Sequence, residues 1–192
     1  MGEHLGSGVG EVYDAAREVL AFWFGEVAPE KRFAKVPELD RVIAERFSGW
    51  RDDVLANDAL GWRGEAETLL AAIILLDQFS RNIHRDTPRA FEADPLAESL
   101  AHDGIDRGWD AELSPERAVF LLMPLMHAEH ADAQALSVAR FEALGLEANI
   151  EFARDHAAVI EKFGRFPSRN MALNRASTPE EEAYLSQPGV GW

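Results

Sequence analysis

The stretch of sequence that decides the fold is LLAAIILLDQFSRNIHRDTPRAFEAD, residues 69 to 94. It begins with an unbroken apolar run, Leu69 to Leu76, and turns polar at Asp77. At about 100° per residue, the apolar side chains of this run surround a helix axis, so we expect a buried central helix from about Glu65 to Ile83. The run is far shorter than the roughly 20 residues that span a bilayer.

Four polar side chains in the second half of this helix continue its apolar stripes: Asp77, Gln78, Arg81 and Asn82. Asp77 and Arg81 are four residues apart and are expected to pair, because an unpaired buried charge is costly. Three interpretations stay open at this point. The helix emerges into solvent at Asp77, its polar groups form a buried structural network of ion pairs, or they face a ligand.

The rest of the chain is also patterned as helices, with no period-2 stretch typical of strands. Amphipathic helices are expected over residues 9–24, 37–57 and 146–163. Pro124 predicts a kink or a break within the helical pattern that ends at Gly145. The predicted fold class is therefore all-α, with antiparallel helix pairs stacked as a tetratricopeptide-like bundle or solenoid in a single domain, residues 1–192.

Further helix starts are marked by a cap residue followed by proline: Thr87-Pro88, Asp94-Pro95, Ser114-Pro115 and Thr178-Pro179. Asp94 is on this basis expected first of all to be a helix cap. The last start also has the pattern of a capping box, in which the side chains of Thr178 and Glu181 bond each other's backbone N–H groups.

Composition excludes several classes of function. The net charge of −15 disfavours nucleic acid and membrane as partners, because phosphate groups bind basic surfaces. Cysteine is absent, so disulfides and thiolate chemistry are excluded. The first twenty residues lack the basic and apolar regions of a secretion signal. We therefore expect a cytoplasmic protein without a cofactor.

Two segments depart from this acidic average. Residues 162–179 contain four basic residues and no acid, and residues 78–91 contain three arginines and one aspartate. Either these are scattered surface arginines, or the two segments meet and bind an anion, for which arginine is well suited.

Other candidate site residues lie in three short motifs: PRAFEAD, PLMHAEH and GRFPSRN. His127 and His130 would share one face of a helix, but two histidines without a third ligand do not predict a metal site, so no metal is expected. His127 is expected first of all to be a buried, hydrogen-bonded histidine. The candidate ligand-binding residues are Asp77, Gln78, Arg81, Asn82, Arg89, His127, Glu129, Arg165, Arg169 and Asn170.

Four segments together resemble the domain-of-unknown-function 924 family: AFWFG, IILLDQFSRNIHRDTPRAFEADPLA, MPLMHAEHADAQALSVARFEALG and GRFPSRNMALNRASTPEEEAYL. The resemblance extends from about Val9 to Leu185. It implies a bacterial protein with an all-helical, tetratricopeptide-like fold, and it assigns no biochemical activity. The candidate residues, with Phe91 and Asp94, match positions of the family's pattern. Ser80 stands where the family usually has proline, and Ser168 where it usually has histidine, so proton transfer by that histidine is not expected here.

Three functions compete. The favoured hypothesis is a binding module whose arginines capture an anionic small molecule or peptide. The second is an enzyme in which His127 is the acid or base, Glu129 or Asp77 orients it, and arginines stabilise a developing negative charge. The third is a purely structural polar network. The oligomeric state is left open.

Overall fold

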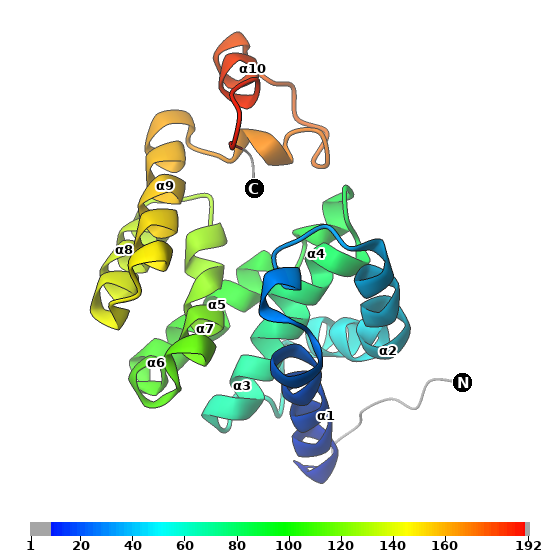
Figure 1. Cartoon of the computed structure of the whole chain (residues 1–192). Helices are drawn as coiled ribbons and strands as arrows, with labels where there is room; N and C mark the ends of the chain where they lie inside the picture. The colour runs from blue at the N-terminus through cyan, green and yellow to red at the C-terminus, as the bar shows by residue number, and fades with distance from the viewer. Residues whose placement is uncertain (1–8, 191–192) are drawn as a thin grey trace.

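The computed structural model describes residues 9–190, and every regular element in that range is a helix (Figure 1). The prediction of an all-α fold is therefore confirmed. The α-helices are α1 (Val9–Ala21), α2 (Pro37–Ala56), α3 (Ala66–Ile73), α4 (Ser80–Ile83), α5 (Asp94–Asp106), α6 (Trp109–Glu112), α7 (Pro115–His127), α8 (Ala131–Leu144), α9 (Glu147–Phe163) and α10 (Pro179–Leu185). The π-helical segments are η1 (Phe22–Glu26) and η3 (Ile74–Phe79), and the 3-10 turns are η2 (Pro29–Lys31), η4 (Pro88–Ala90) and η5 (Pro167–Arg169).

None of the helices formed by residues 9–190 is long and apolar enough to cross a membrane. The expectation that the chain starts without a secretion signal falls largely on residues 1–8, which lie outside the described range.

The central element is the continuous helix made by α3, η3 and α4. All side chains from Leu69 to Leu76 are 0% exposed, as their distribution around the helix axis predicts. This helix packs against α1, α2, α5 and α7. Near its end, the ring of Phe79 lies 4.9 Å from that of Phe47 and 5.4 Å from that of Trp23, measured between centroids. Burying each of these large side chains contributes roughly 1.5 to 3 kcal/mol, so the helix anchors the bundle.

The remaining helices surround this centre in two groups. α1 and α2 pack on one side, whereas α5 and α7 pack on the other, and α8 and α9 extend the bundle outward from α7 (Figure 1). Tetratricopeptide-like stacking of the pairs stays a prediction.

The break expected at Pro124 occurs instead after His127. α7 continues through Pro124, which is buried, and ends where Ala128 adopts an extended conformation (φ −74°, ψ 138°). His130 then caps α8, its Nδ1 accepting a hydrogen bond from the backbone N–H of Ala133 (3.4 Å). The expectation that His127 and His130 share one helix face is therefore wrong, because they lie on either side of this break.

Residues 165–185 form a C-terminal arm that contains η5 and α10. The arm follows Gly164, whose φ of +67° lets the chain leave α9. It packs around a small apolar cluster separate from the main core, in which Phe166 contacts the end of α9. Figure 1 shows α10 standing apart from the helices of the main bundle. The predicted capping box is confirmed: Thr178 N–H donates to Glu181 Oε2 (2.8 Å), and Glu181 N–H donates to Thr178 Oγ1 (3.2 Å).

Candidate functional site

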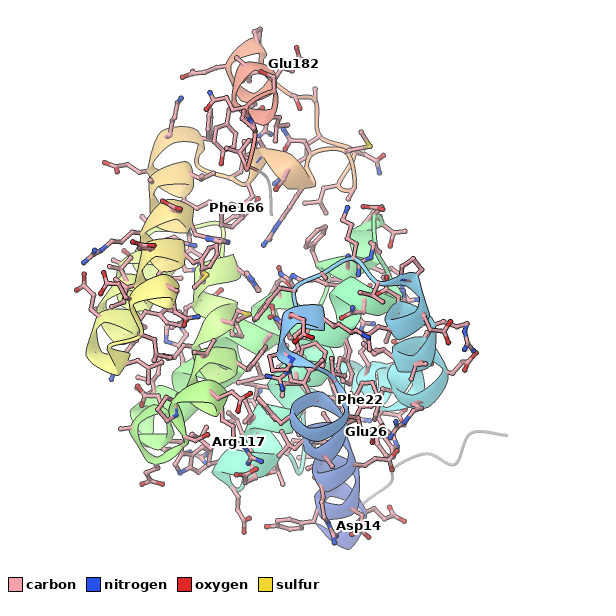
Figure 2. The ribbon with its side chains drawn as sticks, in the orientation of Figure 1. Asp14, Phe22, Glu26, Arg117, Phe166 and Glu182 are labelled. Carbon is pink, nitrogen blue, oxygen red and sulfur yellow. The ribbon has the colours of Figure 1, made fainter. Side chains whose placement is uncertain are left out.

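A cavity of about 640 Å³ opens between α4, the end of α7, α9 and the C-terminal arm. Its volume is in the range of sites for small organic molecules, roughly 300 to 1,000 Å³. The central helix contributes Gln78, Arg81 and Asn82 to the wall, and the arm contributes Arg169. Phe166, which Figure 2 labels where the arm meets α9, also lines the cavity, whereas Glu182 lies on the distant α10.

The charged side chains that line the cavity are mostly cations. Among the lining residues within 9–190, the only acid is Asp86, and the cations are Arg32, Lys35, Arg81, Arg85 and Arg169. Most of the carboxylates that pair with these cations, such as Asp40 and Glu116, lie outside the lining. The lining of the cavity therefore carries more cationic than anionic side chains, although the chain as a whole has a net charge of −15.

Asp77 lies buried behind the cavity wall and orients two of the lining side chains. Its Oδ1 is 2.7 Å from His127 Nδ1 and 2.9 Å from Arg81 Nη1, so the predicted pairing of Asp77 with Arg81 is confirmed. Its Oδ2 accepts a hydrogen bond from Gln78 Nε2 (2.6 Å). Burial alone would raise the pKa of Asp77, but the charge of Arg81 and the hydrogen bonds from His127 and Gln78 hold that pKa below its ordinary value.

His127 is the buried, hydrogen-bonded histidine that the sequence predicts, and it also lines the cavity. Burial lowers its pKa and outweighs the neighbouring carboxylate of Asp77, which raises it; the positive charges of Arg81 and Arg169 add to the lowering. The imidazole is therefore neutral at pH 7. The Nδ1–H group donates a hydrogen bond to the charged Asp77, which leaves Nε2 as a hydrogen-bond acceptor.

Nε2 of His127 accepts no hydrogen bond from residues 9–190. Within the same residues, the side-chain polar atoms that are sealed from water without a partner are Trp23 Nε1, His84 Nε2, Gln134 Oε1 and Ser137 Oγ. The side chain of His127 is 16% exposed and lines the cavity, and its Nδ1 faces Asp77, so Nε2 is the ring nitrogen left for a molecule in the cavity.

Asp94 joins the two cationic segments. Its carboxylate accepts hydrogen bonds from both Nη atoms of Arg81 (3.0 Å each) and from Arg169 Nη1 (3.2 Å). The expectation that Asp94 caps a helix is wrong, since α5 begins at Asp94 itself and no side chain caps it. The physical reason is that its carboxylate is held by the two arginines instead.

Arg169 is a buried cation whose N–H groups are only partly used in hydrogen bonds. Its guanidinium lies 4.7 Å from the ring centroids of both Phe91 and Phe166, and its side chain is 11% exposed. Nη1 donates to Asp94, and Nη2 donates to the carbonyl oxygen of His127 (2.9 Å). The other guanidinium N–H groups make no hydrogen bond within the described part of the chain. Burial, followed by the charge of Arg81, lowers the pKa of Arg169 to about 10.

His156, on α9, is a lining residue that the sequence did not single out. Its ring centroid lies 6.3 Å from that of His127, and its Nδ1 is 2.8 Å from the carbonyl oxygen of Phe152. Burial and then the neighbouring His127 lower the pKa of His156 to about 3. The sequence pattern that could have identified His156 is its spacing: it lies four residues from both Phe152 and Ile160, on the apolar stripe of α9.

The other candidate residues lie outside the cavity. Arg89 pairs with Asp52 and Glu92. The rest secure the C-terminal arm: Arg165 and Asn170 donate to Glu181, and Glu129 accepts from the backbone N–H of Phe166 and from Arg175. Of the ten candidates, Gln78, Arg81, Asn82, His127 and Arg169 line the cavity, with Asp77 behind them. Between residues 9 and 190, no three His, Asp or Glu side chains are grouped so that they could hold a metal ion.

Comparisons with known proteins give a family but no activity. A family model described as "Bacterial protein of unknown function (DUF924)" matches residues 19–189. The solved structure titled "Structure of Protein of Unknown Function ATU0120 from Agrobacterium tumefaciens" is similar with a TM-score of 0.86 at 36% identity, over 91% of this chain and 98% of that one. No curated protein matches the chain.

Proposed function

Because this chain belongs to the DUF924 family, whose description assigns no activity, we propose a function from the cavity itself: the protein binds a small organic anion. A cytoplasmic location fits the absence of cysteine. The cavity volume of about 640 Å³ favours a small molecule over a peptide.

The observation that carries this proposal is the state of Arg169. A buried guanidinium with unused N–H groups, next to a second arginine, gains most from a negatively charged partner. Arginine also binds carboxylates and phosphates through paired hydrogen bonds, which suits it to recognise such a ligand.

Two other functions remain in competition. The ion pairs of Arg81 and Arg169 with Asp94 support a structural network, but such a network alone would leave the other N–H groups of Arg169 unused. The contact of His127 with Asp77 supports an enzyme in which His127 is the acid or base, because Asp77 orients the ring and Nε2 is accessible from the cavity.

Thermal unfolding with added anions tests the proposal. Phosphate, acetate and phenylacetate would each be titrated into the unmodified protein and into Arg169→Gln. A ligand at 100 times its dissociation constant stabilises a fold by about 2.7 kcal/mol, so we expect at least one of these anions to raise the Tm of the unmodified protein. The Arg169→Gln variant should fold and lose this response.

Arg89→Gln is the matched control, because Arg89 is also paired with acids but does not line the cavity. It should respond to anions as the unmodified protein does. If no anion shifts the Tm of the unmodified protein and Arg169→Gln unfolds, the polar cluster is a structural network and the binding function is refuted.

A further inference from the structure

We infer that the ligand is a hydroxy acid with an apolar body: a monoanionic carboxylate next to a hydroxyl group, carried on an aromatic or similarly bulky apolar group. This inference rests on the proposed function, and it specifies the class of anion from three separate features of the cavity.

The first feature is the acceptor at His127. Both oxygens of Asp77 already receive hydrogen bonds, and Oδ1 faces His127 Nδ1 at 2.7 Å. Asp77 therefore fixes the proton of the neutral ring on Nδ1, and Nε2 offers only a lone pair. A bare carboxylate oxygen at Nε2 would place two lone pairs against each other. A hydroxyl group donates its proton there, so the ligand needs a donor beside its anionic group.

The second feature is the charge of the inner cluster. Arg81 and Arg169 carry two positive charges, which Asp77 and Asp94 balance while His127 is neutral. A single negative charge can use the unused N–H groups of Arg169 and the cations farther out in the lining. A dianion would meet the two nearby carboxylates without matching positive charge, so a carboxylate fits better than a doubly charged phosphate.

The third feature is the exposed aromatic surface. Phe33 is 68% exposed and Phe152 is 49% exposed, and both line the cavity together with Met123 and Met126. Large apolar side chains of this kind are usually buried, and covering them removes apolar surface from water. An apolar group on the ligand would cover them while the carboxylate lies against the arginines.

A matched pair of probes tests the inference: mandelate and phenylacetate, which differ by one hydroxyl group. Dissociation constants would be measured by calorimetry for both enantiomers of mandelate. We expect one enantiomer to bind the unmodified protein about tenfold more tightly than phenylacetate, the value of one hydrogen bond. Glycolate, which has the carboxylate and hydroxyl but no ring, should bind more weakly than mandelate.

His127→Phe keeps a ring and removes the acceptor, so the preference for mandelate should disappear in this variant. His102→Gln is the control, because His102 is an exposed histidine that does not line the cavity; it should keep the preference. If His127→Phe does not fold, the unmodified protein can be tested by NMR instead. The ¹⁵N resonance of His127 Nε2 should shift when mandelate is added, in the direction expected for a neutral ring nitrogen that accepts a hydrogen bond.

The outcomes separate the two proposals. If phenylacetate binds as tightly as mandelate, or if mandelate leaves the Nε2 resonance unchanged, the hydroxy-acid inference is overturned and anion binding stands. If neither probe binds and phosphate and acetate also fail to bind, the proposed function itself is refuted.

Discussion

Acidification should destabilise this fold through His156, which is 7% exposed and has a pKa lowered to about 3. In the unfolded chain the pKa of histidine is about 6.5, so between these two values the unfolded state binds one more proton than the folded state. A histidine with a depressed pKa contributes its full stability above pH 6.5, and this contribution is lost as the pH falls towards 3.

The expected magnitude follows from this difference. Each pH unit well inside the window costs about 1.4 kcal/mol, and the step from pH 7.5 to 4.5 costs about 2.7 kcal/mol through His156 alone. Other groups titrate in the same range. The lowered pKa of His127 acts in the same direction, whereas neutralising part of the charge of −15 favours the compact state. Only a comparison between variants isolates the contribution of His156.

Urea unfolding at pH 7.5, 6.5, 5.5 and 4.5 would be compared for the unmodified protein, His156→Gln and His102→Gln. The free-energy difference between the unmodified protein and His156→Gln should shrink by about 2.7 kcal/mol from pH 7.5 to 4.5. His102 is exposed, so its variant should follow the unmodified protein at every pH. A difference for His156→Gln that stays constant with pH would show that His156 is not held neutral by burial, and the reasoning would fail.

Three further predictions concern packing, the arm and metals. A methyl group at Gly104 would lie 2.9 Å from Cδ1 of the fully buried Leu121, so Gly104→Ala should cost about 1 to 2 kcal/mol in urea unfolding, whereas Gly49→Ala, with open space around it, should stabilise α2 by about 0.5 to 1 kcal/mol. Glu181→Gln weakens the hydrogen bonds from Arg165 (2.7 and 2.8 Å), so a protease should cut residues 165–185 faster while the main transition keeps its Tm; an unchanged cutting rate would contradict this. Chelation with EDTA should leave the Tm unchanged, and a loss of stability that zinc restores would overturn that prediction.

The central helix shows what a sequence of this kind predicts well. Its apolar run has only one stable environment, so burial and position follow directly from the residues. The same argument gave an interior position for Asp77 and Arg81 as one interpretation beside emergence into solvent, and the excess of basic residues in two segments gave a shared anion site that includes Arg81 and Arg169 as one of two. These are properties of local pattern and composition, which need no knowledge of distant contacts.

The details of the site depended on contacts that local pattern does not contain. Asp94 precedes a proline, as a helix cap would. Its carboxylate nevertheless accepts a hydrogen bond from Arg169, which lies 75 residues later in the chain. Arg165 and Arg169 lie in the same short motif, GRFPSRN, but only Arg169 lines the cavity. The 3-10 turn that follows Phe166 separates the two side chains. Helical periodicity also assumed about 100° per residue, which the π-helical residues 74–79 do not follow.

That π-helical segment has a consequence for insertions and deletions. A π-turn commonly accommodates one extra residue within an α-helix. The helical segments on its two sides can therefore keep the same faces towards the core when one residue is removed between them. Deleting Leu75 should therefore leave α3 and α4 packed in the bundle, yet move Asp77 out of reach of His127. In this protein the length of residues 74–79, and not only their identity, specifies the polar site, so a single-residue deletion is the change that separates the scaffold from the chemistry it supports.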